Sequence, residues 1–105
     1  MIDTIRQRAL DGQLLYSKHA RDEMEREEFG VITDEEAVSV LTGGKIIEPY
    51  PDDKPYPSFL VFGLTEKQRP LHVVCAMSTD EDLLIIVTVY QPHPARWIDF
   101  ERRKR

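Results

Sequence analysis

Two apolar segments joined by a short polar one constrain the fold of this chain more than any other feature. Residues 71–77 and 83–90 are rich in valine, isoleucine and leucine, and residues 78–82 read Ser-Thr-Asp-Glu-Asp. This pattern is typical of two strands connected by a tight turn. We therefore expect an antiparallel hairpin over residues 71–78 and 83–90. Both strands are apolar on both faces, so they should be central in their sheet.

The residues that precede this hairpin begin with a helical pattern. Three helices are predicted, over about residues 3–10, 17–28 and 33–43. Ser17 can cap the second helix, because its hydroxyl can accept a hydrogen bond from a backbone N–H of the first turn. Thr33 and Glu36 have the spacing of a capping box at the start of the third. Gly43-Gly44 ends that helix.

After Gly44 the pattern changes to strands. A short strand is predicted at residues 45–48, a proline-rich connection at 49–57 and a buried strand at 59–62, followed by the hairpin. After Pro94 a final helical turn is expected over about residues 95–103. Helices followed by a run of strands indicate the α+β class. We expect the N-terminal helices to pack on one face of an antiparallel meander.

Length and composition exclude several classes of protein. A chain of 105 residues with 41% hydrophobic and 31% charged residues is typical of one globular domain, 1–105. No apolar run approaches the ~20 residues of a membrane span, and the first residues lack a signal-peptide pattern. The lone cysteine, Cys75, lies in an apolar strand and is expected to be buried. A cytoplasmic protein is the expectation.

The charge is unevenly distributed along the chain. The formal net charge is −5, which disfavours a strong nucleic-acid binder. Residues 91–105, however, carry five basic and two acidic side chains, so this segment is +3 and the remainder is −8. Such asymmetry permits a local anion-binding edge on an acidic body. A solvated basic tail is the alternative interpretation.

Polar side chains interrupt the apolar strands and form the first set of candidate site residues. His72 lies in the first strand of the hairpin and Tyr90 at the end of the second. If Ser78 pairs with Leu83, His72 faces Val89, and a shift of one residue places it opposite Thr88 or Tyr90 instead. One step of register moves every side chain to the other face. Clustering gives polar groups partners or water, so we expect His72 and Tyr90 on one face, near His19.

His19 and the arginines after the sheet complete the candidate set. His19 begins a helix with Asp22 and Glu23 three and four residues later, and either carboxylate can orient the imidazole. The candidate phosphate ligands are Arg96, Arg102 and Arg103, because a guanidinium can form a bidentate pair of hydrogen bonds with a phosphate. Three histidines and one cysteine show no metal-ligand spacing. No metal or other cofactor is expected.

Several blocks of residues, taken together, carry a resemblance to a known family. The blocks are Ser17-x-His19-Ala20-x-x-x-Met24, Ile46-Ile47-Glu48-x-Tyr50-Pro51-Asp52-Asp53-x-Pro55-Tyr56-Pro57-Ser58, Arg69-Pro70-Leu71-His72-Val73-Val74, Ile86-Val87-Thr88-Val89-Tyr90-x-Pro92, and Trp97 with Arg102-Arg103. Across about residues 17–103 the chain resembles the domain-of-unknown-function family 4258. The resemblance implies a remote relation to RelE-like and BrnT-like toxins, which are small α+β ribonucleases of toxin–antitoxin pairs. Family members commonly follow the methionine with an arginine and a glycine, whereas this helix continues with Glu25-Arg26-Glu27-Glu28 and is more acidic.

Two functions from different classes follow as expectations. The first is a RelE-like, metal-independent RNA endonuclease with a cognate antitoxin. Its base and acid would come from His19, His72 and Tyr90, and its phosphate ligands from Arg96, Arg102 and Arg103. The second is a non-catalytic domain that binds a protein through its sheet face or edge. A positive cleft beside His19, His72 and Tyr90 favours the first, and an acidic or apolar surface favours the second.

Overall fold

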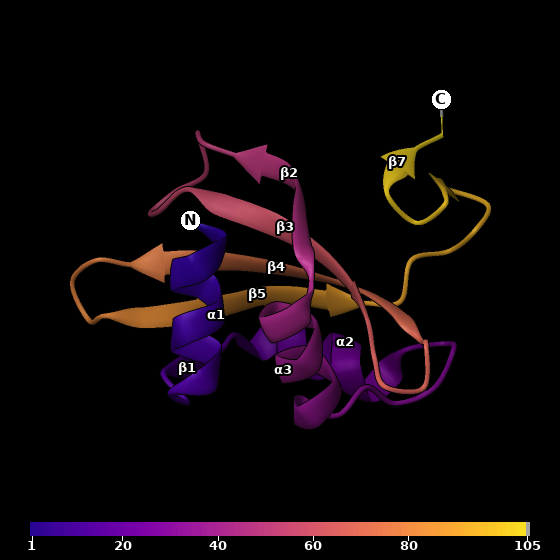
Figure 1. Cartoon of the computed structure of the whole chain (residues 1–105), viewed down its shortest axis with the longest axis horizontal. Coiled ribbons are helices and arrows are strands. Elements are labelled where there is room, and N and C mark those ends of the chain that lie inside the picture. Colours follow the sequence, from indigo (N-terminus) through magenta and orange to yellow (C-terminus); the bar gives the residue numbers. More distant parts are fainter. Residues whose placement is uncertain (105) are drawn as a thin grey trace.

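A computed structural model describes residues 1–104 and shows one main sheet with the strand order β1-β5-β4-β3-β2 (Figure 1). In chain order the elements are α1 (Ile2–Leu10), β1 (Leu14–Tyr16), α2 (Lys18–Arg26), α3 (Asp34–Gly43), β2 (Lys45–Tyr50), β3 (Ser58–Leu64), β4 (Pro70–Ser78), β5 (Leu83–Tyr90), β6 (Trp97–Ile98) and β7 (Arg102–Arg103). The predicted α+β class is confirmed. Strands β2 to β5 form the expected antiparallel meander, and β1 joins it parallel to β5, which makes the sheet mixed.

The expected central hairpin is confirmed and consists of β4 and β5. Ser78 pairs with Leu83 beside the turn, but a bulge in β5 at Val87 shifts the pairing, so that His72 lies opposite Tyr90. A bulge adds one residue to one strand and re-aims the side chains beyond it. His72 and Tyr90 therefore share a face, as expected. Leu71, Val73 and Cys75 alternate with His72 on β4 and belong to the apolar core on the other face.

Strand β1 was not expected from the sequence. Its three residues pair with Leu84, Ile85 and Ile86 of β5. Ser17 follows directly, donates through its hydroxyl to the carbonyl of Val87 at 3.0 Å and accepts from the backbone N–H of Ala20 at 3.0 Å. One side chain thus anchors the chain to β5 and caps α2, as the sequence predicted for the cap.

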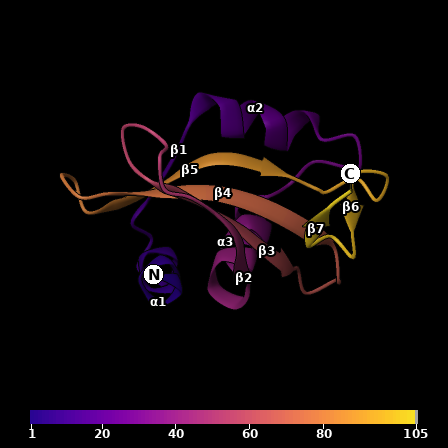
Figure 2. The ribbon, with the colours of Figure 1, turned by 90° about the horizontal axis from the view of Figure 1, so that it is seen from above.

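We expected the helices on one face of the sheet, and α1 and α3 do lie there, whereas α2 runs along the edge of β5. α1 and α3 lie together over that face, and α2 lies alongside β5, beyond the end of β1 (Figure 2). Ala20 and Met24 of α2 belong to the same buried cluster as the apolar residues of α1 and α3. Because β1 ends beside Ile86, α2 begins at the edge of β5 and runs past its exposed backbone. Glu23 accepts from the N–H of Val89 at 3.0 Å, and Glu27 accepts from that of Gln91 at 2.6 Å. Helix side chains thereby satisfy edge donors that a strand would otherwise pair.

The junction of α3 and β2 depends on a close backbone approach. Thr33 and Glu36 form the predicted capping box at the start of α3. At its other end, a Cβ built on Gly44 would lie 2.4 Å from the carbonyl oxygen of Phe62 and 2.5 Å from that of Val40. Only glycine fits this contact, which packs α3 closely against β3 and positions the apolar face of the helix on the core.

The C-terminal segment forms a small hairpin rather than the predicted helical turn. β6 pairs antiparallel with β7, and the N–H of Glu101 donates to the carbonyl of Ile98 at 3.1 Å. Asp99 and Phe100 have positive φ angles of 53° and 63°, a conformation that reverses the chain and ends any helix. Trp97 is buried at the base of the hairpin. Arg105 of the basic tail lies outside the described residues.

Candidate functional site

A cleft of about 960 Å³ separates α2 from the C-terminal hairpin. Glu23, Glu27 and Glu28 form one wall, and Arg96, Arg103 and Lys104 contribute to the other, so carboxylates and cations face each other. Tyr90, at the end of β5, lies between these walls. Two candidate arginines therefore meet the candidate tyrosine here. Arg102 lies on the outer side of the hairpin, where it lines a different hollow with Ile47 and Ile98.

His72 lies beneath Tyr90 and has no exposed surface. Its Nδ1 lies 3.1 Å from the hydroxyl oxygen of Tyr90, and its Nε2 lies 2.6 Å from the carbonyl oxygen of Phe100. The rings of Tyr90 and Trp97 both meet the imidazole edge-on. His72 thus connects the sheet to the C-terminal hairpin and fixes the phenol of Tyr90, but it does not form part of the cleft wall.

Burial controls the protonation of both rings. It lowers the pKa of His72 below the ordinary value of 6.5, and the carbonyl of Phe100 and the carboxylate of Glu48 only partly oppose this. The imidazole is therefore neutral at pH 7. Burial, followed by the neighbouring Tyr50, raises the pKa of Tyr90 to about 12, so the phenol keeps its proton.

A second polar group fastens the hairpin to β2. Arg103 donates from Nε and Nη2 to the carboxylate of Glu48 at 3.0–3.1 Å, and its guanidinium lies 4.7 Å from the ring centre of Trp97. Tyr50 donates its hydroxyl to Glu48 at 2.6 Å. Burial alone would raise the pKa of Glu48, but the hydrogen bonds from Arg103 and Tyr50 outweigh it and hold that pKa below 4.5.

His19 lies on the exposed side of α2, where it lines a hollow that also reaches Tyr90. Its Nε2 lies 3.3 Å from Oε1 of Glu23, the pairing predicted from their spacing of four, and its side chain is 65% exposed. Burial raises the pKa of Glu23, although the N–H of Val89 and the imidazole of His19 act in the opposite direction. His19 and Tyr90 therefore line the same acidic hollow, to which Glu23 also contributes.

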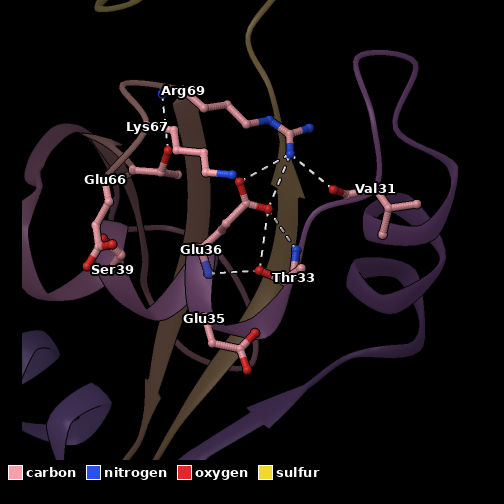
Figure 3. Close-up of a pocket in the computed structure, with 9 residues that line it drawn as sticks. Val31, Thr33, Glu35, Glu36, Ser39, Glu66, Lys67 and Arg69 are labelled. Carbon is pink, nitrogen blue, oxygen red and sulfur yellow. Dashed lines mark hydrogen bonds and ion pairs between the residues drawn. The ribbon is translucent and has the colours of Figure 1, made fainter.

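Arg69 has an organising role that the sequence analysis did not assign. Its guanidinium donates to the carbonyl of Val31 at 3.0 Å and to the carboxylate of Glu36 at 3.2 and 3.3 Å (Figure 3). It also donates to the carbonyl of Gly30 and to the side chain of Gln91 at 2.7 Å. It thus joins the start of β4 to the α2–α3 loop, to α3 and to the end of β5. In the sequence, the position of Arg69 in the Arg69-Pro70 motif block was the signal that could have indicated this role.

Residues 1–104 contain neither a metal-binding cluster nor a membrane-spanning helix. No three side chains of His, Cys, Asp or Glu come together in a group that could hold a metal ion. No helix in this part of the chain has both the length and the apolar character needed to cross a membrane.

Comparison with known proteins identifies the family. The model for "Domain of unknown function (DUF4258)" matches residues 16–91, which run from the end of β1 to just beyond β5. The match includes His19, His72 and Tyr90, and the C-terminal hairpin lies beyond it. No curated protein and no solved structure matches the chain significantly. Because the match covers well over half of the chain and agrees with the motif blocks, the chain belongs to the DUF4258 family.

Proposed function

We propose that the protein is a metal-independent RNA endonuclease, the RelE-like toxin of a cytoplasmic toxin–antitoxin pair. One observation carries the proposal. The hydroxyl of Tyr90, held by the buried His72, lies in a cleft with the cations of Arg96, Arg103 and Lys104, and His19 borders the adjoining hollow. Proton-handling groups beside cations are what cleavage of a phosphodiester requires.

Each side chain has a role that its position permits. Arg96 and Lys104 bind the phosphate of the RNA backbone, since the guanidinium of Arg103 is already paired with Glu48. His19, oriented by Glu23, exchanges a proton with the leaving or attacking oxygen. His72 lies behind Tyr90 and holds its hydroxyl through Nδ1. Arg102, on the outer side of the hairpin, contacts the RNA strand as it leaves the cleft.

A second candidate is a non-catalytic protein-interaction domain. The acidic wall of the cleft favours it, because Glu23, Glu27 and Glu28 repel an RNA backbone and attract a basic protein segment. Two of these carboxylates are occupied by backbone N–H groups of Val89 and Gln91, which reduces the repulsion of RNA. For this reason the nuclease remains the first proposal.

Cleavage of RNA by the purified protein tests the proposal. Single-stranded oligoribonucleotides of varied sequence, incubated at low salt with a chelator, should be cut, because the proposed chemistry needs no divalent metal. His19→Ala and Tyr90→Phe should each reduce the rate by about 10²–10⁴-fold, the range for loss of a positioned acid–base group. Both variants should fold, because neither loses much apolar volume.

Tyr56→Phe is the matched control for the tyrosine. It also removes one phenolic hydroxyl, which donates to Asp80 beside the β4–β5 turn and away from the cleft. Its rate should equal that of the parent. If varied RNAs remain intact, or if His19→Ala and Tyr90→Phe cleave as fast as the parent, the interaction domain replaces the nuclease as the first candidate. Expression with and without the neighbouring gene product, scored for growth arrest, tests for an antitoxin.

A further inference from the structure

The hydrogen bonds around His72 determine which of its nitrogens carries the proton. A carbonyl oxygen can only accept, so the 2.6 Å contact with Phe100 requires a hydrogen on Nε2. A neutral imidazole has one N–H, and Nδ1 therefore presents a lone pair. The hydroxyl of Tyr90, 3.1 Å from Nδ1, must donate to it.

This arrangement leaves Tyr90 with a defined polarity toward the cleft. Its hydrogen points inward to His72, and the lone pairs of its oxygen are available to the solvent-filled side. A phenol free in solution can donate or accept, but this one is held as an acceptor. A ligand group that meets it must therefore bring a hydrogen-bond donor.

We propose that Tyr90 and His72 together form a proton acceptor for the 2′-hydroxyl of a ribonucleotide, which makes the cleft selective for RNA through this group. The inference rests on the proposed function, because it names the substrate group that the same cleft takes. The 2′-hydroxyl donates to the phenolic oxygen, and the neighbouring phosphate lies against the cations of Arg96 and Lys104.

The proton transfers balance without any further reactant. The 2′-hydroxyl gives its proton to the oxygen of Tyr90, which passes its own proton to Nδ1 of His72. The 2′-oxygen attacks phosphorus, the bond to the 5′-oxygen breaks, and the leaving oxygen takes a proton from the imidazolium of His19. The products are a 2′,3′-cyclic phosphate and a 5′-hydroxyl end. The imidazolium of His72 then returns its proton through Tyr90 to water, and His19 regains a proton from water, so that both rings return to their starting states.

Two groups beside His72 can stabilise a transient positive charge, although the net effect of its surroundings favours the neutral ring. Burial disfavours the imidazolium most and, with Arg103 on β7, lowers the pKa of His72, whereas the carbonyl of Phe100 and the carboxylate of Glu48 on β2 favour the charged ring. Besides burial, Tyr50 on β2 and Glu23 on α2 raise the pKa of the neighbouring Tyr90. The ring is therefore neutral at rest and can accept a proton during the reaction, as a relay requires.

Nuclear magnetic resonance of ¹⁵N-labelled protein tests the resting state independently of any activity. The nitrogens of His72 should show a protonated Nε2 and an unprotonated Nδ1 at pH 7. A protonated Nδ1 would overturn the proposal, because Tyr90 would then have to point its hydrogen into the cleft.

Binding tests the hydroxyl contact, again without requiring cleavage. A fluorescent oligoribonucleotide and its fully 2′-fluoro counterpart share sugar shape and charge, but the second lacks the 2′ donor. In a His19→Ala background, chosen to slow any cleavage, RNA should bind about 2–12-fold more tightly, the equivalent of one net hydrogen bond. Adding Tyr90→Phe should abolish that preference. Equal binding of the two oligonucleotides before Tyr90 is changed would overturn the proposal.

Kinetics separate proton acceptance from mere positioning. In His72→Asn the side-chain oxygen can still accept from Tyr90, but it cannot take up a proton, so cleavage should fall about 10²–10⁴-fold while RNA binding is retained. The rate of the parent should fall at acid pH, below the ordinary 6.5 of histidine, as His72 becomes protonated before substrate arrives. If His72→Asn cleaves as well as the parent, His72 only positions Tyr90. If the parent cleaves no RNA, the proposed nuclease fails, whereas the binding preference still reports on the hydroxyl contact.

Discussion

The two faces of β4 are buried to the same depth by different means. Leu71, Val73 and Cys75 face α1 and α3 through apolar contact, and all are fully buried. His72, equally buried on the opposite face, is held by the hydroxyl of Tyr90 and the carbonyl of Phe100. Apolar contact depends on volume and adapts to small changes in shape. The polar face depends on the direction of individual donors, so it positions the hairpin and the cleft more specifically.

Leu71→Ala should produce the largest loss of stability, because it removes apolar atoms from the tightly packed face. We expect the free energy of unfolding to fall by about 2–5 kcal/mol, as measured by urea denaturation. Leu71→Met is the matched control and should cost less than about 1.5 kcal/mol, since it keeps the volume. If Leu71→Ala lowered the free energy of unfolding by less than about 1.5 kcal/mol, this face would be packed more loosely than its burial indicates.

His72→Leu tests the polar face at similar volume. The carbonyl of Phe100 would lose its donor, and a buried unpaired acceptor costs about 1–3 kcal/mol. In the parent, the pKa of His72 is lower in the folded state than the 6.5 of an unfolded chain. As pH falls below 6.5, the unfolded chain therefore binds a proton at His72 more readily than the folded protein does. The stability that neutral His72 contributes is then lost.

His72→Leu lacks this titration, so its free energy of unfolding should decline less than that of the parent between pH 7.5 and about 5.5. Urea denaturation at several pH values measures the difference. Glu48 contributes a separate loss in the parent and in the variant, because its lowered pKa places its titration below 4.5. Parallel pH profiles for the two proteins would show that His72 is not the group that makes the polar face sensitive to acid.

Arg103→Ala should have the smallest effect of the three, because its ion pair with Glu48 is partly exposed to water. We expect a loss of about 0.2–1 kcal/mol, which shrinks at high salt as screening weakens the pair. Arg102→Ala is the control on the same strand and should change stability by less than about 0.5 kcal/mol. A loss at Arg103 that does not respond to salt would assign its role to the contact with Trp97.

Local signals made part of this structure predictable. The capping residues Ser17 and Thr33 and the polar turn at residues 78–82 act on their immediate neighbours, so the α2 and α3 starts and the central hairpin were expected correctly. The family resemblance was equally visible in the motif blocks. These signals do not depend on which elements later come together.

The remainder depended on contacts between distant segments. Strand β1 has three residues and a partner about seventy residues later, which no local pattern indicates. The bulge at Val87 has no glycine to mark it, and Phe100 adopts a positive φ without the glycine or asparagine that usually announces one. The sequence left the register of His72 open for this reason, and it assigned a helical turn where the C-terminal hairpin forms.

The parallel pairing of β1 with β5 has a consequence for how the chain assembles during synthesis. β1 binds a strand that is synthesised about seventy residues later, so the pairing of Leu14 with Leu84 closes a loop over residues 14–84. Until residues 84–91 emerge, β1 lacks its partner and the carboxylates of Glu23 and Glu27 lack the backbone donors that they cap. Contacts this distant slow folding. Residues 14–27 therefore lack their final partners until the segment that carries Tyr90 has been synthesised.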